Sequence, residues 1–144
     1  KSYFEQMHPG LPVDSSSTDI RGFCTLSGDE YSVEHLATAT AFSAIGEPDG
    51  FLHTLKSAGI TPRHEVRFPD HHSYKARDLE SLIQQADDHH CESLVCTAKD
   101  AVKVVKLPLS ESVTARIKVL EIELDFPVET ILDRIQGDQF HRDA

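Results

Sequence analysis

Stretches of small apolar residues alternate with stretches of helical periodicity through the middle of the chain. Ala37–Ser43 is small and apolar with interspersed threonines, a composition typical of a strand that is buried on both faces. The next apolar residues recur at helical spacing, after a proline suited to a first helical turn and before a glycine suited to a helix end. They are Phe51, Leu52, Leu55 and Ala58, with Pro48 before them and Gly59 after them.

The same alternation continues along the chain. Arg63–Phe68 is predicted to be the second strand, and Ser93–Thr97 a short apolar third strand. Between them, apolar residues at positions i, i+3, i+4 and i+7 predict a second helix. Two further apolar segments follow, Val102–Leu107 and Val113–Leu124, the latter with alternating polarity. The apolar residues of the second helix are Leu79, Leu82, Ile83 and Ala86.

Strands and helices that alternate in this way predict an α/β domain with a mainly parallel sheet. In such sheets the functional crevice lies at the carboxyl ends of the strands. The predicted loops that leave strands at that edge carry the conspicuous polar residues of the chain. These loops are Ile45–Pro48, Pro69–His72 and Thr97–Asp100.

The two ends of the chain have a different character. Turn-forming residues separate two strand-like pieces, Ser2–Met7 and Ile20–Ser27, which we expect to pair as a β-hairpin arm. Pro127 is expected to open a last helix, and the final residues are expected to be disordered. The expected division, in chain order, is an arm at 1–28, an α/β domain at 29–138 and a disordered tail at 139–144.

Composition and charge disfavour several classes of function. The net charge of −10, from 14 basic and 24 acidic side chains, disfavours binding to a nucleic-acid backbone. No apolar run approaches the roughly 20 residues that cross a bilayer. The first residues lack the apolar stretch of a secretory signal, and the 3 scattered cysteines are typical of a reducing compartment, so we expect a cytoplasmic protein. The sequence also lacks the pattern G-x-x-x-x-G-K-S/T, so we expect no nucleotide bound through a Walker A loop of its own.

A carboxylate beside two imidazoles follows the second predicted strand. Asp70 can orient a neighbouring histidine and raise its basicity, which would make His71 a general base. The alternative is a loop in which Asp70 caps the following turn and the histidines are solvated. Lys99 and Asp100, after the third strand, either bind a phosphate or tie their loop down as an ion pair.

Two weaker features complete the candidate chemistry. His89–Cys91, with Cys96 nearby, matches no zinc-binding spacing, so we expect no metal site. Gly46 suits a tight turn from strand to helix. A phosphate at the N-terminus of that helix is the other interpretation, although the charge of Glu47 works against an anion there.

Taken in order, three segments resemble the C-terminal half of the tetraacyldisaccharide 4'-kinase family, the lipid A 4'-kinases. The segments are Ala41–Pro48 with Phe51, Phe68–Tyr74 and Cys96–Lys103, and the resemblance extends over residues 2–125. Ala98 departs from the family, which usually has a glutamate at that position. The P-loop half of the family, with its Walker A motif and magnesium-binding acids, has no counterpart in this sequence. We therefore expect the chain to be one domain of a larger enzyme.

The resemblance implies a kinase that uses Mg²⁺ and moves the γ-phosphate of ATP onto the 4'-hydroxyl of a tetraacyldisaccharide 1-phosphate. The reaction would take place at the cytoplasmic face of the inner membrane of a Gram-negative bacterium. The implied fold is a three-layer α/β/α Rossmann-like domain, joined to an N-terminal P-loop lobe by a two-stranded linker that the hairpin arm would supply. That N-terminal lobe would bind most of the ATP and Mg²⁺ and would contact the membrane.

The resemblance also implies roles for particular residues. His71 would sit in the cleft between the lobes and cooperate with an acid from the other lobe, and Asp70 would orient it. The isolated chain is expected to be inactive. The candidates for a loop that contacts phosphate or substrate are Lys99, Asp100, Gly46 and Tyr74.

Two other functions use the same residues. A DHH-type metal-dependent phosphoesterase shares the letters Asp70-His71-His72, but it needs further Asp-rich metal motifs, and none lies upstream of Asp70. A non-catalytic α/β interaction domain, whose polar loops are merely solvated, is the second alternative.

Overall fold

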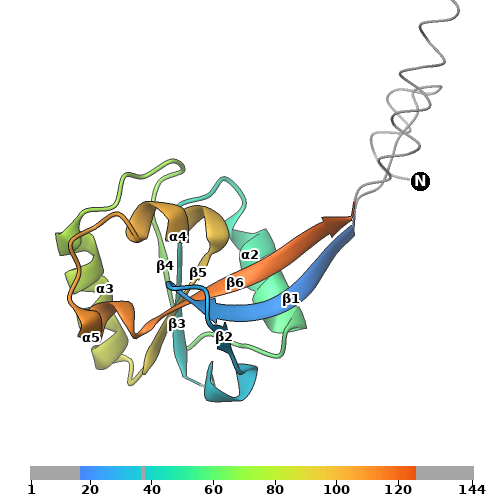
Figure 1. Cartoon of the computed structure of the whole chain (residues 1–144), viewed down its shortest axis with the longest axis horizontal. Helices are drawn as coiled ribbons and strands as arrows, with labels where there is room; N and C mark the ends of the chain where they lie inside the picture. The colour runs from blue at the N-terminus through green and yellow to red at the C-terminus, as the bar shows by residue number, and fades with distance from the viewer. Residues whose placement is uncertain (1–16, 37, 126–144) are drawn as a thin grey trace, which may run out of the picture. The chain divides into compact units, whose positions relative to one another are not determined.

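The computed structural model describes residues 17–36 and 38–125 of the 144-residue chain (Figure 1). The predicted strand Ser2–Met7, the helix expected after Pro127 and the tail lie outside these residues. Within the described ranges, Ile20–Ile122 forms one compact unit. The elements in chain order are β1 (Ser17–Thr25), β2 (Glu30–Tyr31), the 3-10 helix η1 (Val33–Leu36), β3 (Ala39–Ser43), α2 (Pro48–Ser57), β4 (His64–Arg67), α3 (Ala76–Asp88), β5 (Ser93–Thr97), α4 (Ala98–Val104), α5 (Glu111–Thr114) and β6 (Ile117–Asp125).

The strands form one six-stranded sheet in the order β2-β1-β6-β5-β3-β4. β3 pairs in parallel with β4 on one side and with β5 on the other, and β5 pairs in parallel with β6. β2 pairs antiparallel with β1, which places Phe23 opposite Tyr31. The mainly parallel α/β sheet expected from the sequence is therefore confirmed.

The chain reverses its direction of travel across the sheet at β3. From β3 it passes through α2 to β4 at the edge, and it then returns through α3 to β5 on the other side of β3. Such a reversal leaves a crevice between the loops that follow the two neighbouring strands. In this sheet those loops follow β3 and β5, and both carry segments that sequence analysis singled out.

Two apolar clusters cover the two faces of the sheet. Along β3, Phe42 belongs to the cluster that contains the buried residues of α3 and α4, while its neighbour Ala41 belongs to the cluster that contains those of α2. Leu94 and Val95 alternate in the same way along β5. All five residues of β3 are buried. The layers are therefore helix, sheet and helix, as Figure 1 shows with α2 on one side of the sheet and α3 on the other.

Two expected boundaries are corrected at the C-terminal half of the sheet. α4 begins at Ala98, directly after β5, because the Thr97 hydroxyl accepts a hydrogen bond from the Asp100 N–H at 3.2 Å and caps the helix. The segment Thr97–Asp100 is consequently the first turn of a helix and not a loop. Likewise, β6 begins only at Ile117, because α5 occupies the start of the apolar segment Val113–Leu124.

The predicted strand Ile20–Ser27 forms most of β1. β1 lies between β2 and β6 in the sheet, and its residues Phe23 and Cys24 are buried in the core. The C-terminal part of the predicted arm thus contributes to the sheet of the domain. The division of the chain at residue 28 stays a prediction.

We expect Leu82→Ala to lower the free energy of unfolding by about 2–5 kcal/mol, because it empties a fully buried position where α3 packs on the sheet. The matched control is Val102→Ala on α4, whose side chain is 59% exposed and which should change the stability by less than about 0.5 kcal/mol. Urea denaturation followed by circular dichroism measures both. Equal effects of the two variants would contradict the assignment of the core.

Candidate functional site

The carboxyl ends of β3, β4 and β5 meet at one edge of the sheet, and backbone hydrogen bonds join the segments that follow them. The Phe68 N–H donates to the Ser43 carbonyl at 2.9 Å, and the His71 N–H donates to the Ala44 carbonyl at 3.3 Å. Three of the segments singled out in the sequence therefore lie together, since Asp100 at the start of α4 also bonds to Ala44.

The carboxylate of Asp100 is fully buried beneath these segments. Its Oδ1 accepts hydrogen bonds from the Ala44 N–H at 3.0 Å and from the Tyr74 hydroxyl at 3.0 Å. Its Oδ2 accepts from the Thr97 hydroxyl at 2.7 Å. Burial, and secondly the charge of Asp100, raise the pKa of the Tyr74 hydroxyl, which therefore stays protonated and keeps donating. Asp100 and Tyr74 thus face the interior of the protein and not the open edge.

Lys99 has a different environment from its neighbour Asp100. Its side chain is exposed, and among the residues that the structure describes it has no hydrogen bond or ion pair. The partners of Asp100 are all neutral donors. The ion-pair interpretation of Lys99 and Asp100 is therefore not what holds this segment, and the ammonium of Lys99 faces solvent.

Asp70 and His71 point outward from the same edge. The side chain of His71 is 80% exposed and that of Asp70 is 47% exposed, with His71 Nε2 3.6 Å from Asp70 Oδ2. Asp70 Oδ1 accepts a hydrogen bond from the His71 N–H at 2.9 Å. His71 has a φ of 60°, a left-handed conformation that is uncommon for residues other than glycine. The carboxylate thus holds the backbone of His71 and lies close to its ring, and the imidazole is open to a partner.

His72, in contrast, turns inward and anchors the loop. Its Nε2 lies 3.0 Å from Asp78 Oδ2, and its ring stacks on Phe68 with the centroids 4.8 Å apart. The Lys103 ammonium donates to the His72 carbonyl at 3.2 Å. Sequence analysis missed Asp78 and Lys103. The available signal was that Asp78 occupies the third position of α3, where a carboxylate often caps a helix, as it does here for the Lys75 N–H at 2.8 Å.

Gly46 lies against the carboxylate of Asp70. A Cβ atom at this position would stand 3.3 Å from Asp70 Oδ2, closer than an ordinary contact. The absence of a side chain therefore allows the loop after β3 to approach the loop after β4. The φ of Gly46 is not in the left-handed region, so this close approach, and not the turn into α2, is the reason that the structure gives for glycine here.

The described residues contain no group of three or more histidine, cysteine or acidic side chains that could hold a metal ion. His89 stacks on His64 at 3.9 Å, and Cys96 lies in the core, where burial raises its pKa. In this fold His89 and Cys96 therefore pack against neighbouring side chains.

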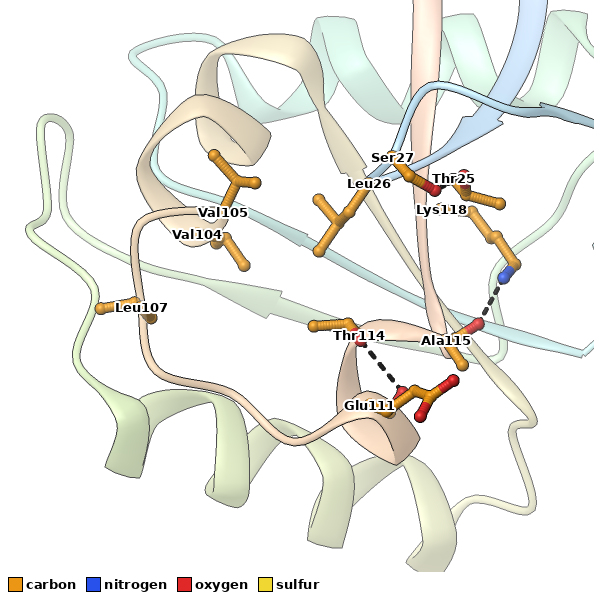
Figure 2. A pocket seen from close by; sticks show the side chains of 10 residues that line it. All are labelled: Thr25, Leu26, Ser27, Val104, Val105, Leu107, Glu111, Thr114, Ala115 and Lys118. Atoms are coloured by element: carbon orange, nitrogen blue, oxygen red, sulfur yellow. Dashed lines mark hydrogen bonds between the residues drawn. The ribbon is translucent and has the colours of Figure 1, made fainter.

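A groove of about 550 Å³ lies elsewhere, between the β1–β2 turn, the end of α4, α5 and the start of β6 (Figure 2). Figure 2 shows Lys118 in its wall, with the ammonium donating to the Ala115 carbonyl. Burial lowers the pKa of Lys118. None of the residues predicted for the site lines this groove.

The fold and this edge together define an α/β domain of the doubly wound class, with the buried carboxylate of Asp100 at the switch point between β3 and β5 and an exposed carboxylate–imidazole pair after the edge strand β4. Comparison with known families then identifies the group. The model of the tetraacyldisaccharide-1-P 4'-kinase family, LpxK, matches residues 9–137. The chain belongs to this family.

Individual relatives agree with the family match. The tetraacyldisaccharide 4'-kinase of Paramagnetospirillum magneticum is 35% identical over 92 residues, which are 64% of this chain and 26% of that protein. That of Gluconobacter oxydans is 40% identical over 84 residues, 58% of this chain and 24% of that protein. A crystal structure of LpxK from Aquifex aeolicus in complex with ATP matches 94% of this chain and 40% of that chain, with 16% identity and a TM-score of 0.49.

The chain spans about a quarter of the length of these two curated relatives. Within residues 17–36 and 38–125, no helix is long and apolar enough to span a bilayer.

We expect the contact between His72 and Asp78 to make stability depend on pH. The hydrogen bond with His72 lowers the pKa of Asp78 in the folded protein, so its contribution is complete above the ordinary aspartate pKa of about 4 and is lost as the pH falls through the lowered value. Asp78→Asn should therefore be less stable than the wild type at neutral pH, and the difference should disappear in acid. Urea denaturation across this range measures it, with Asp88→Asn on the exposed end of α3 as control. A difference that does not change with pH would contradict the assignment.

Proposed function

We propose that this chain is the C-terminal lobe of a tetraacyldisaccharide 4'-kinase. The whole enzyme would transfer the γ-phosphate of ATP to the 4'-hydroxyl of tetraacyldisaccharide 1-phosphate. Membership of the family and the names of the relatives support this reaction. The observation that carries the role of this lobe is the Asp70–His71 pair, which is held by its backbone and presented outward at the carboxyl edge of the sheet.

The exposure of His71 suits a residue that works against a second lobe. Phosphoryl transfer depends on positioning and on stabilising charge, so a lobe that closes over bound ATP can deliver an imidazole to the acceptor hydroxyl. The neutral ring would take the proton of the 4'-hydroxyl, in cooperation with an acid from the other lobe, as the hydroxyl oxygen attacks the γ-phosphorus. The bond between the γ-phosphorus and the β,γ-bridging oxygen would break at the same time, and ADP would leave. Asp70, 3.6 Å from Nε2, would stabilise the positive charge that the ring gains.

ATP and Mg²⁺ are assigned to the other lobe in this proposal. The sequence has no Walker A pattern. Among the described residues there is also no group of three or more histidine, cysteine or acidic side chains that could hold a metal ion. The lipid disaccharide would enter from the membrane side through the other lobe, at the cytoplasmic face of the inner membrane.

The remaining site candidates have different parts in the proposal. The exposed ammonium of Lys99 is free to meet a phosphate oxygen, and Gly46 leaves room for Asp70. Asp100 and Tyr74 are buried, so in the proposal they hold the loop in place from inside the protein and do not contact the substrate. No observation on the described residues favours the phosphoesterase alternative over the kinase.

We expect the 144-residue chain alone to have no kinase activity, because the Walker A pattern that would bind the phosphates of ATP is not in its sequence. The assay measures transfer of labelled γ-phosphate to the lipid disaccharide, with the Gluconobacter oxydans relative as positive control. Phosphorylation by the isolated chain above the rate without protein would overturn the two-lobe proposal.

In the complete enzyme, His71→Ala should lower kcat by about 10²–10⁴, the usual contribution of a general base. The matched control is His53→Ala, an exposed histidine on α2 that is not among the site residues and should leave kcat unchanged. The same assay measures both variants. An unchanged kcat for His71→Ala would instead favour a non-catalytic role for this edge.

A further inference from the structure

We propose that Asp100 is a positioning residue that holds His71 in its outward conformation through Ala44 and Tyr74. The role of the held histidine in catalysis rests on the function proposed above, whereas the clamp itself is a property of the described residues.

The first arm of the clamp runs through Ala44, directly after β3. The Ala44 N–H donates to Asp100 Oδ1 at 3.0 Å, and the carbonyl of the same residue accepts from the His71 N–H at 3.3 Å. Ala44 is itself buried. Asp100 thus fixes the place of Ala44, and Ala44 in turn fixes the place of the His71 backbone.

The second arm runs through Tyr74, three residues beyond His71. Its hydroxyl donates to the same oxygen, Asp100 Oδ1, at 3.0 Å. Its ring packs edge-on against Phe42 and Phe68, with centroids 5.8 Å and 5.2 Å away. One carboxylate oxygen therefore restrains the turn at His71 itself, through Ala44, and three residues beyond it, through Tyr74.

His71 needs such a clamp because its own side chain cannot hold it. A histidine with a φ of 60° is in a sparsely populated conformation, which persists only where the surrounding structure enforces it. Its side chain is 80% exposed, so packing adds little restraint. The restraint has to come from the backbone, where the described partners of the His71 N–H are the Ala44 carbonyl and Asp70 Oδ1.

Direct contact between Asp100 and substrate is a poorer explanation of the same residue. The carboxylate is 0% exposed, and its oxygens already accept hydrogen bonds from three described segments of the chain. A buried negative charge would also repel a phosphate that came close. The geometry therefore favours action through other residues.

The first test is amide hydrogen exchange by NMR on the full 144-residue chain. Asp100→Asn keeps the shape of the side chain but loses its charge, and it should speed exchange of the His71 and Ala44 amides by about tenfold. Tyr74→Phe, a milder change, removes one arm and should speed exchange at His71 by a smaller factor. Asp88→Asn, an exposed aspartate bonded to Gln84, is the matched control and should change neither.

The β5 amides report whether an effect is local. In a merely structural role, exchange at Leu94 and Val95 in β5 would rise by the same factor as exchange at His71. An equal rise in exchange at β5 and at His71, found in both Asp100→Asn and Tyr74→Phe, would overturn the proposal. Unchanged exchange at His71 in these variants would also overturn it. If Asp100→Asn does not fold, Tyr74→Phe alone decides, by the same comparison. This test uses neither ATP nor lipid, so it stands or fails independently of the kinase proposal.

The second test measures kinetics in the complete enzyme. Asp100→Asn should lower kcat by about 10- to 100-fold with the KM for ATP unchanged, because the reacting group is displaced while the nucleotide site is not. If Asp100 acts through His71, adding Asp100→Asn to His71→Ala should lower kcat by less than about twofold more. A full further loss in the double variant would show that Asp100 acts by another route. An inactive wild-type enzyme, together with the expected exchange result, would reject the kinase proposal and keep the clamp.

Discussion

The buried carboxylate of Asp100 is the interaction on which the carboxyl edge of this sheet depends. It has no cation beside it in the described residues and is satisfied by neutral donors from the segments after β3, after β4 and at the end of β5. Each of these donors in turn needs the carboxylate, because a buried N–H or hydroxyl that has no acceptor costs about 1–3 kcal/mol of stability. Loss of the carboxylate would therefore loosen three segments at once.

Around this centre the loop after β4 divides its side chains between two directions. His72 and Tyr74 turn inward, where they contact Asp78 and Asp100, while Asp70 and His71 turn outward. The inward pair holds the backbone of the loop, and the outward pair is the part of the loop for which we propose a catalytic role. In the proposed kinase, the held backbone of this loop would bring the His71 ring to the acceptor hydroxyl from a defined position.

The segments that resemble the kinase family are the same segments that meet at this edge. Some residues of these segments are explained by contacts within the fold, and others by the proposed contact with substrate. Thr97, Asp100 and Tyr74 are explained by the hydrogen bonds that they make, and Gly46 by its approach to Asp70. The outward residues Asp70 and His71 are those for which we propose a contact with substrate. Ala98 lies exposed at the first position of α4, where the clamp does not involve its side chain.

The sequence by itself determined the parallel α/β architecture, because the periodicity of small apolar strands and amphipathic helices depends only on local spacing, as in β3, α2 and β5. It also located the three polar segments, since each directly follows a predicted strand. It did not determine that Thr97–Asp100 starts a helix, that Asp100 is buried, or that Asp78 and Lys103 hold His72. These facts depend on contacts between residues such as Ala44 and Asp100, which lie far apart in the chain and meet only when β3 and β5 pair. Hydrogen bonds of this kind leave no periodic pattern, so only the tertiary structure decided which charges face inward and which face solvent.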